Sequence, residues 1–181
     1  PYSQLVEENR RRGQGDPEFE LIDTGVFDGD RYFDVMIEYA KAAPDDICCQ
    51  VTVTNRGPEA ATLHVLPQLW ARNNWSWKPV AQRPSLTGHG DGSVTTFHPS
   101  MPAMRFTCER ATEWLFCENE TNPNRLFGMT QEGYFKDGIN DYIVQGDKTA
   151  VNPAKIGTKA AAHCRADLPP GGEARFRFRL A

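Results

Sequence analysis

Along much of the chain, apolar and polar residues alternate with a period of two, which is typical of β-strands that bury one face. The alternation is clearest near the C-terminus, where Phe176 and Phe178 alternate with Arg175 and Arg177. We expect the two phenylalanines to point into a core and the two arginines to point away from it. The Pro-Pro-Gly-Gly sequence at 169–172 predicts the turn of this final hairpin.

Similar alternation predicts further strands, separated by turns that are rich in Gly, Pro, Asn and Asp. These strands are expected over residues 19–27, 31–42, 47–56, 61–70, 94–98, 104–109, 113–118 and 159–168. In the second of them, Val35, Ile37 and Tyr39 should share a buried face, because alternate residues of a strand point to the same side. Asp34 and Glu38 should then face water.

Only one segment has the features of a longer helix. Residues 3–12 are good helix formers that end in arginines, and a glycine-rich stop follows them. Residues 119–153 are irregular, so we expect a long structured loop with at most one helical turn near Ile139. The pattern therefore predicts an all-β fold. It is a single antiparallel β-sandwich domain over residues 1–181, with at most one or two short helices.

Charge and composition exclude several classes of partner. The chain has 20 Lys and Arg residues against 24 Asp and Glu residues, so it lacks the basic excess that gathers nucleic acid. No apolar run approaches the ~18 residues of a membrane span, and no membrane partner is expected. The five cysteines are dispersed and form no C-x-x-C motif. This pattern predicts core thiols in a reducing compartment, the cytoplasm.

The sequence contains no convincing motif for catalysis, a cofactor or a metal. The glycines at 88–92 lack the spacing of a dinucleotide-binding fingerprint, and no phosphate-binding G-K-[ST] sequence occurs. Asp137, Asp141 and Asp147 lack the order of a calcium-binding loop. The histidines stand apart from one another in the sequence, as His64, His89, His98 and His163. We therefore predict no catalytic residue, no cofactor and no metal site.

A cluster of tryptophans follows the fourth predicted strand. Trp70, Trp75 and Trp77 fall within eight residues, beside Asn74 and Lys78. Flat rings next to fixed hydrogen-bond donors suit sugar rings, which makes Asn74, Trp75, Trp77 and Lys78 candidate carbohydrate-binding residues. The alternative is that this bulky loop only covers an open end of the core, because tryptophan is usually mostly buried.

Several runs of the sequence together resemble a known protein family. They are LVEENRRR at 5–12, DTGVFDGDRYFDV at 23–35, NRGPEAATLHVLPQLWARNNWSW at 55–77, FKDGINDYIVQG at 135–146 and AVNPAKIGTKAAAH at 150–163. Over nearly its whole length the chain resembles the amino-terminal β region of bacterial glucosidase and mannosyl-oligosaccharide-glucosidase-like proteins, which are allied to glycoside hydrolase family 63. In such proteins a β super-sandwich precedes a six-hairpin α/α barrel that carries the catalytic carboxylates.

The resemblance implies a non-catalytic accessory β domain that packs on a downstream α/α barrel. The chain opens with Pro-Tyr-Ser and no Met, so we expect an excised or processed piece. The resemblance implies that it is a piece of a larger multi-domain glycosidase. Loops of such a domain can wall one side of a sugar cleft. The substrate-binding candidates are, first, Asn74, Trp75 and Trp77 and, second, Asn140, Asp141 and Tyr142.

Two other functions stay open. A self-sufficient carbohydrate-binding module needs exposed, roughly coplanar rings such as those of Trp75 and Trp77. A purely structural or oligomerisation layer would bind no ligand, and a broad apolar patch beside the arginine-bearing last strand would favour docking. For the chain by itself we expect no hydrolysis of glucosides or mannosides, and weak binding of free sugars.

Overall fold

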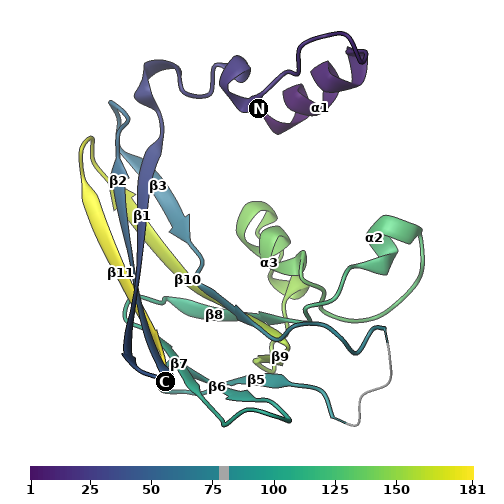
Figure 1. Ribbon diagram of the computed structural model, residues 1–181, viewed down its shortest axis with the longest axis vertical. Coiled ribbons are helices and arrows are strands. Elements are labelled where there is room, and N and C mark those ends of the chain that lie inside the picture. The colour runs from purple at the N-terminus through teal and green to yellow at the C-terminus, as the bar shows by residue number, and fades with distance from the viewer. Residues whose placement is uncertain (78–81) are drawn as a thin grey trace. The chain divides into compact units, whose positions relative to one another are not determined.

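The computed structural model describes residues 1–77 and 82–181 (Figure 1). Lys78, one of the predicted sugar-binding residues, lies outside the described residues. The fold is an all-β sandwich of two antiparallel sheets with few short helices, as the sequence predicts. No helix among the described residues is long and apolar enough to cross a membrane.

The larger sheet has seven strands in the order β1-β2-β11-β7-β6-β5-β9. Its strands are β1 (Phe33–Ala43), β2 (Asp46–Asn55), β11 (Glu173–Leu180), β7 (Arg105–Cys108), β6 (Ser93–Phe97), β5 (Ser85–Gly88) and β9 (Ile156–Gly157). Strands β5, β6 and β7 form consecutive antiparallel pairs, and β11 pairs with β7. These consecutive pairs form an antiparallel meander.

The smaller sheet is built around β10 (Lys159–Leu168). Three strands pair with it: β3 (Ala61–Val65), β4 (Gln68–Trp70) and β8 (Glu113–Cys117). Residues 159–161 pair with β4 along one edge and with β8 along the other. The first residues of β10 therefore lie in the middle of the sheet, where each side chain can be covered only from above or below.

The helices are short. Helix α1 (Tyr2–Arg11) confirms the helix predicted over 3–12. Helix α2 (Pro123–Phe127) begins after Asn122, whose side chain accepts hydrogen bonds from two backbone N–H groups of the first turn. Helix α3 (Gly138–Asn140) continues into a π-helical turn and confirms a turn near Ile139. The expectation of at most one helical turn over residues 119–153 is wrong, because α2 and the 3₁₀ helix Lys148–Ala150 lie there as well. The 3₁₀ helices are Leu21–Thr24, Asp28–Asp30 and Lys148–Ala150.

The chain divides into two compact units. The first comprises residues 1–36, 52–62 and 167–174, and the second comprises residues 37–51, 63–166 and 175–181. Every predicted site residue that the structure describes belongs to the second unit. The prediction of one domain over the whole chain stays a prediction.

Within the first unit, one asparagine joins two turns that are far apart in the sequence. Asn55 is buried, and its side-chain amide donates to the carbonyl oxygens of Glu59 at 2.8 Å and Leu168 at 3.0 Å. Its backbone N–H donates to the carbonyl oxygen of Gly172 at 3.0 Å. A buried amide is costly without partners, so these bonds fix the turn after β2 against the turn before β11.

The strand predicted over residues 19–27 is wrong. Leu21–Thr24 is a 3₁₀ helix, and the backbone N–H of Glu20 donates to the Asp23 carboxylate at 2.8 Å. Gly25 follows in the left-handed conformation, with a φ of 71°. Asp side chains offer the backbone local hydrogen bonds that compete with a strand, and the alternation of apolar residues did not reveal them.

In the second unit the core between the sheets is formed by large side chains from both layers. Leu86, Val94 and Phe106 come from the seven-stranded sheet, and Phe116 and Ala160 come from the four-stranded sheet. Phe178 packs against this cluster, and its neighbour Phe176 is fully buried, whereas Arg175 and Arg177 are exposed. The predicted register of the last strand is therefore confirmed. The hairpin predicted around 169–172 is wrong, because the strands on either side of this turn, β10 and β11, belong to different sheets.

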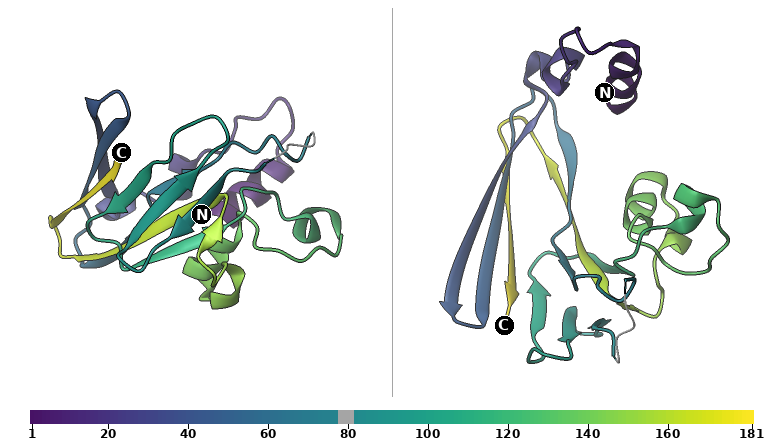
Figure 2. Two further views of the ribbon diagram at one scale, coloured as in Figure 1. Left: turned by 90° about the horizontal axis from the view of Figure 1, so that it is seen from below. Right: turned by 45° about the vertical axis from the view of Figure 1, so that its right-hand side comes forward.

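A second cluster covers the opposite face of the four-stranded sheet. Leu115 and Ala161 pack there with Ile139 of α3 and with Val151. Figure 2 shows α3 and its π-helical turn beside β8 and β10, and contacts join α3 to β8. The long segment after β8 is therefore a covering layer, in which short helical turns bury apolar residues.

The burial expected for β1 is wrong. Val35, Ile37 and Tyr39 are 53%, 52% and 74% exposed, although they share one side of the strand as predicted. Strand β1 is the outermost strand of its sheet. Alternation predicts which side chains share a face, but it does not predict whether another layer covers that face.

Gly138 offers a test of the covering layer. A Cβ atom at this position would overlap the carbonyl oxygen of Ala150, which belongs to backbone and cannot turn away. We expect Gly138→Ala to lower the free energy of unfolding by about 2 kcal/mol, as overpacked positions do. Gly90→Ala is the matched control, because a Cβ atom there meets nothing within 4 Å. Urea unfolding that gives the two variants equal stability would contradict the packing described for α3.

Candidate functional site

The tryptophan loop after β4 is held by Trp75. Its indole is 6% exposed, and the indole N–H donates to the Glu120 carboxylate at 2.5 Å. Arg83 contacts the same carboxylate at 3.2 Å, and its guanidinium lies 5.8 Å from the centre of the Trp75 ring. Trp75 therefore anchors the loop, and its ring has no open face for a ligand.

Asn73 gives the loop a second anchor, which the sequence analysis did not single out. Its side-chain amide donates to Ser76 Oγ at 2.9 Å and to the carbonyl oxygen of Asn119 at 3.0 Å. Asn119 in turn donates to the carbonyl oxygen of Ala71 at 3.0 Å. These bonds join the loop to the end of β8. The neighbouring Asn74 is exposed.

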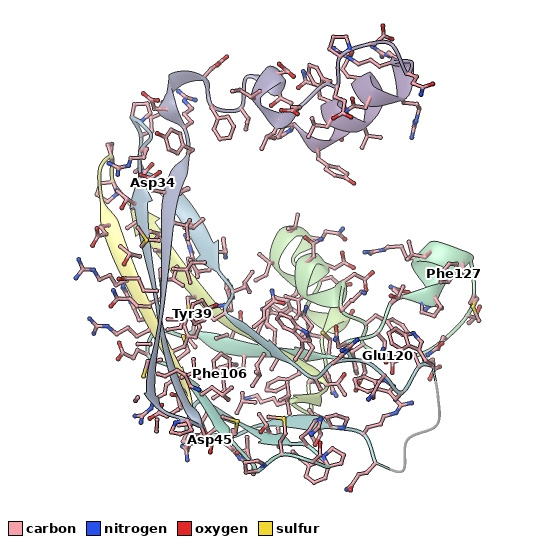
Figure 3. The ribbon with its side chains drawn as sticks, in the orientation of Figure 1. Asp34, Tyr39, Asp45, Phe106, Glu120 and Phe127 are labelled. Atoms are coloured by element: carbon pink, nitrogen blue, oxygen red, sulfur yellow. The ribbon has the colours of Figure 1, made fainter. Side chains whose placement is uncertain are left out.

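Trp77 is exposed and lines an open hollow. Its side chain is 78% exposed, and Phe127 of α2 is 69% exposed. The hollow has a volume of about 500 Å³, and Glu120, Gln131 and Lys136 also line it. We call it the Trp77 hollow. Figure 3 labels Phe127 on α2 and Glu120 in the segment that follows β8. Flat rings stand here beside a carboxylate, an amide and an ammonium group.

Asn140 lines a second hollow, of about 360 Å³, which we call the Asn140 hollow. Its polar lining consists of His64, Gln68, Lys136, Asn140 and Lys159. Its apolar lining includes Ile139 and Val144. Lys136 lines both hollows. The structure thus brings Trp77 and Asn140, which come from two separate predicted sets, to hollows that share one residue.

Asp141, unlike its neighbour Asn140, does not line the Asn140 hollow or the Trp77 hollow, where a ligand could reach it. It is 9% exposed, and its Oδ2 atom pairs with Arg125 at 2.7 Å. Arg125 also pairs with Asp137 at 2.8 Å, so one guanidinium joins α2 to the start of α3. The Oδ1 atom of Asp141 is buried without a hydrogen-bond partner among the described residues. Asp141 therefore holds the layer together rather than facing either hollow.

Tyr142 begins a chain of polar contacts that sequence reasoning missed. Its hydroxyl donates to Glu113 Oε2 at 2.6 Å, and Glu113 Oε1 lies 2.8 Å from Nδ1 of His163. The Nε2 atom of His163 lies 2.7 Å from Nδ1 of His64, which lines the Asn140 hollow. These contacts orient His64 and connect it, through His163, to the carboxylate of Glu113. Two histidines separated by 99 positions gave no signal in the sequence.

These contacts change the acidity of Glu113. Burial by itself raises the pKa of Glu113, but the hydrogen bonds from Tyr142 and His163 outweigh it, so the net pKa is lowered. The pKa of Tyr142 is raised, first by the same hydrogen bond and then by burial. Glu113 thus stays ionised at neutral pH and accepts from both neighbours. Among the described residues, no group of three or more His, Cys, Asp or Glu side chains could hold a metal ion.

Removal of the Tyr142 hydroxyl should make the free energy of unfolding less dependent on pH in the acidic range. The stability that Glu113 contributes is present above the usual Glu pKa of about 4.3 and is lost as pH falls through its lowered folded-state pKa. Because Glu113 is 40% exposed, we expect Tyr142→Phe to cost about 1 kcal/mol at pH 7, with the difference shrinking below about pH 4. Urea unfolding at several pH values measures both effects.

Tyr134→Phe is the matched control for this variant. Tyr134 packs against the same apolar cluster, but its hydroxyl has no hydrogen-bond partner in the part of the chain that the structure describes. Its effect on stability should be small and independent of pH. Equal losses in the two variants, or a loss from Tyr142→Phe that persists unchanged in acid, would contradict the role given to Glu113.

Comparison with known proteins finds a similar protein but assigns no activity to this site. No protein-family model matches the chain. The chain is similar to the Saccharomyces cerevisiae protein named "Uncharacterized protein YMR196W", with 32% identity over 218 aligned positions. The alignment covers 99% of this chain and 20% of the yeast protein, so the chain spans about a fifth of the length of this curated relative. The similarity covers every candidate site residue, and the relative's name states no activity.

Proposed function

We propose that the chain is a non-catalytic accessory β domain of a glucosidase-like glycoside hydrolase, and that it lines one side of a sugar cleft. The observation that carries this proposal is the exposed Trp77 ring in a hollow whose other lining is largely polar. The sequence resemblance to the amino-terminal β region of such enzymes supports it. The partner in this proposal is a downstream α/α barrel, which supplies the catalytic carboxylates.

The chemistry of the Trp77 hollow suits a sugar. A pyranose has an apolar C–H face that packs on an aromatic ring, and Gln131 and Lys136 could reach its hydroxyls. One stacked ring and one or two hydrogen bonds in contact with water contribute on the order of 1 kcal/mol each. Together they give about millimolar binding at best, once the cost of association is included. Such a surface suits one wall of a larger cleft.

Exposed apolar residues around α2 support the docking part of the proposal. Leu126, Phe127 and Met129 are more than half exposed, and they follow one another closely in the sequence. Exposed apolar residues that gather in one short segment are typical of an interface with another protein layer. In the proposed enzyme this surface packs beside the barrel, and the adjacent Trp77 then faces the cleft.

The burial of Trp75 counts against a self-sufficient carbohydrate-binding module. Such a module needs at least two open rings in roughly one plane, and Trp75 contributes none because Glu120 and Arg83 hold it within the loop. A purely structural layer is the second candidate, because the exposed residues of α2 would serve it equally well.

The five cysteines are free thiols in the structure, which supports a reducing compartment, the cytoplasm.

Trp77→Ala tests the proposal in the full-length protein that contains this chain. We expect kcat/KM for an aryl glucoside to fall about tenfold, the factor that corresponds to ~1.4 kcal/mol of lost transition-state binding. Trp70→Ala is the control, because Trp70 is also exposed but lines a different hollow, and it should leave kcat/KM within about twofold. Unchanged kinetics in a folded Trp77→Ala enzyme would favour the purely structural layer.

The chain by itself should bind sugar weakly and should not hydrolyse it. Titration of the purified chain with glucose and manno-oligosaccharides, followed by tryptophan fluorescence or calorimetry, should give dissociation constants of about 1 mM or weaker. Micromolar binding would favour the binding module. Turnover of an aryl glucoside that is lost on changing one of this chain's carboxylates would overturn the non-catalytic assignment.

A further inference from the structure

The structure brings two of the cysteines together across the sandwich. Cys108, the last residue of β7 in the seven-stranded sheet, has its Sγ atom 3.5 Å from Sγ of Cys164. Cys164 lies in β10 of the four-stranded sheet. A disulfide has an S–S distance of about 2.05 Å, so the two sulfurs need to approach by about 1.5 Å.

The two thiols differ in their access to solvent. Cys164 is fully buried, whereas Cys108 is only partly buried. Cys108 lines an open hollow of about 540 Å³, together with Asp91 and Trp114. A small molecule can therefore reach Cys108 from this hollow but cannot reach Cys164 directly.

The surroundings of Cys108 favour its thiolate. The hydrogen bond from Cys164 is the largest influence, burial opposes it, and the backbone N–H groups of Arg110 and Ala111 add to it. Together they lower the pKa of Cys108 from its usual value to about 7. The same sulfur–sulfur hydrogen bond and burial raise the pKa of Cys164. Cys164 therefore keeps its proton when Cys108 loses its own.

We propose that Cys108 and Cys164 form a peroxide-sensitive thiol pair, in which Cys108 is oxidised first and Cys164 then closes a disulfide between the two sheets. The oxidant is hydrogen peroxide or an organic hydroperoxide. This inference is independent of the proposed function, because it uses no residue of the Trp77 hollow or the Asn140 hollow.

The chemistry balances in two steps. The Cys108 thiolate attacks the peroxide, so that an S–O bond forms, the O–O bond breaks, and the leaving hydroxide or alkoxide takes a proton. The sulfur of Cys164 then attacks the sulfenic acid on Cys108, so that an S–S bond forms and the S–O bond breaks. The hydroxyl group leaves as water with the proton of Cys164. Two thiols are oxidised by two electrons, and one peroxide is reduced to two molecules of water, or to one of water and one of alcohol.

The other cysteines are poorer candidates for this reaction. Cys117 is fully buried, and burial raises its pKa to about 12. Cys48 and Cys49 are adjacent in β2, so their side chains point to opposite faces of the strand and do not meet readily. Burial raises the pKa of Cys49 as well. Oxidation should therefore be selective for the Cys108–Cys164 pair.

The test treats the reduced protein with a small excess of hydrogen peroxide, quenches with a thiol-blocking reagent in denaturant, and maps the peptides. We expect the number of free thiols to fall from five to three, with one Cys108–Cys164 linked peptide and the loss of two hydrogen atoms in mass. The reaction rate should rise as pH is raised through about 7, where Cys108 becomes a thiolate. The melting temperature should rise by several degrees after oxidation and return after reduction, because a cross-link constrains the unfolded chain.

Two variants separate the two roles. Cys164→Ser should leave Cys108 as a sulfenic acid that a dimedone probe traps, whereas Cys108→Ser should give neither the adduct nor the disulfide. Cys48→Ser is the control and should behave as the wild-type protein does. Five free thiols after peroxide treatment, or linked peptides that contain Cys48 or Cys49 in place of Cys108, would overturn the proposal. The peptide map of the wild-type protein decides the matter even if a variant fails to fold.

Discussion

The rest of the second unit depends on the close approach of two layers to the start of β10. Ala160, Ala161 and Ala162 are fully buried, and alternate residues of a strand face opposite sides. Ala160 packs between the two sheets, and Ala161 packs under the layer that contains α3. Large side chains at these positions would push one layer away, because protein interiors are filled nearly to crystal density. The small alanine side chains of β10 thus allow the seven-stranded sheet to pack closely on one face of the four-stranded sheet and the α3 layer to pack closely on the other.

Hydrophobic periodicity was a sufficient guide wherever a strand has one buried face. It predicted the register of β11 and the approximate bounds of most strands, because side chains there follow the pleat. It failed at residues 19–27, where Asp23 and Gly25 favour a local turn. It also could not predict that residues 119–153 form a covering layer. That layer is stabilised by contacts between distant residues, such as Ile139 with Ala161, and a short apolar run does not reveal its partner.

The candidate site was predictable in composition but not in arrangement. The clustering of tryptophans correctly drew attention to the loop, yet only the structure separates the anchor Trp75 from the exposed Trp77. The difference arises from Glu120, which follows β8 and accepts the indole N–H of Trp75, and from Arg83 near the end of the loop, which binds the same carboxylate. The series of polar contacts from Tyr142 to His64 could not be predicted from the sequence for the same reason. Its members come from separate strands and a helical turn, and only strand pairing brings them within hydrogen-bonding distance.

The exposure of β1 has a consequence for how this chain behaves in concentrated solution. An outermost strand with apolar residues such as Val35 and Tyr39 on an open face is a template on which a second chain can add a strand. Glu38 and Lys41 lie on the same strand, and charges at a sheet edge oppose such addition because pairing would bury them. These charged residues contribute little to the core, so their neutralisation should favour the addition of a second chain to this edge before it reduces folding.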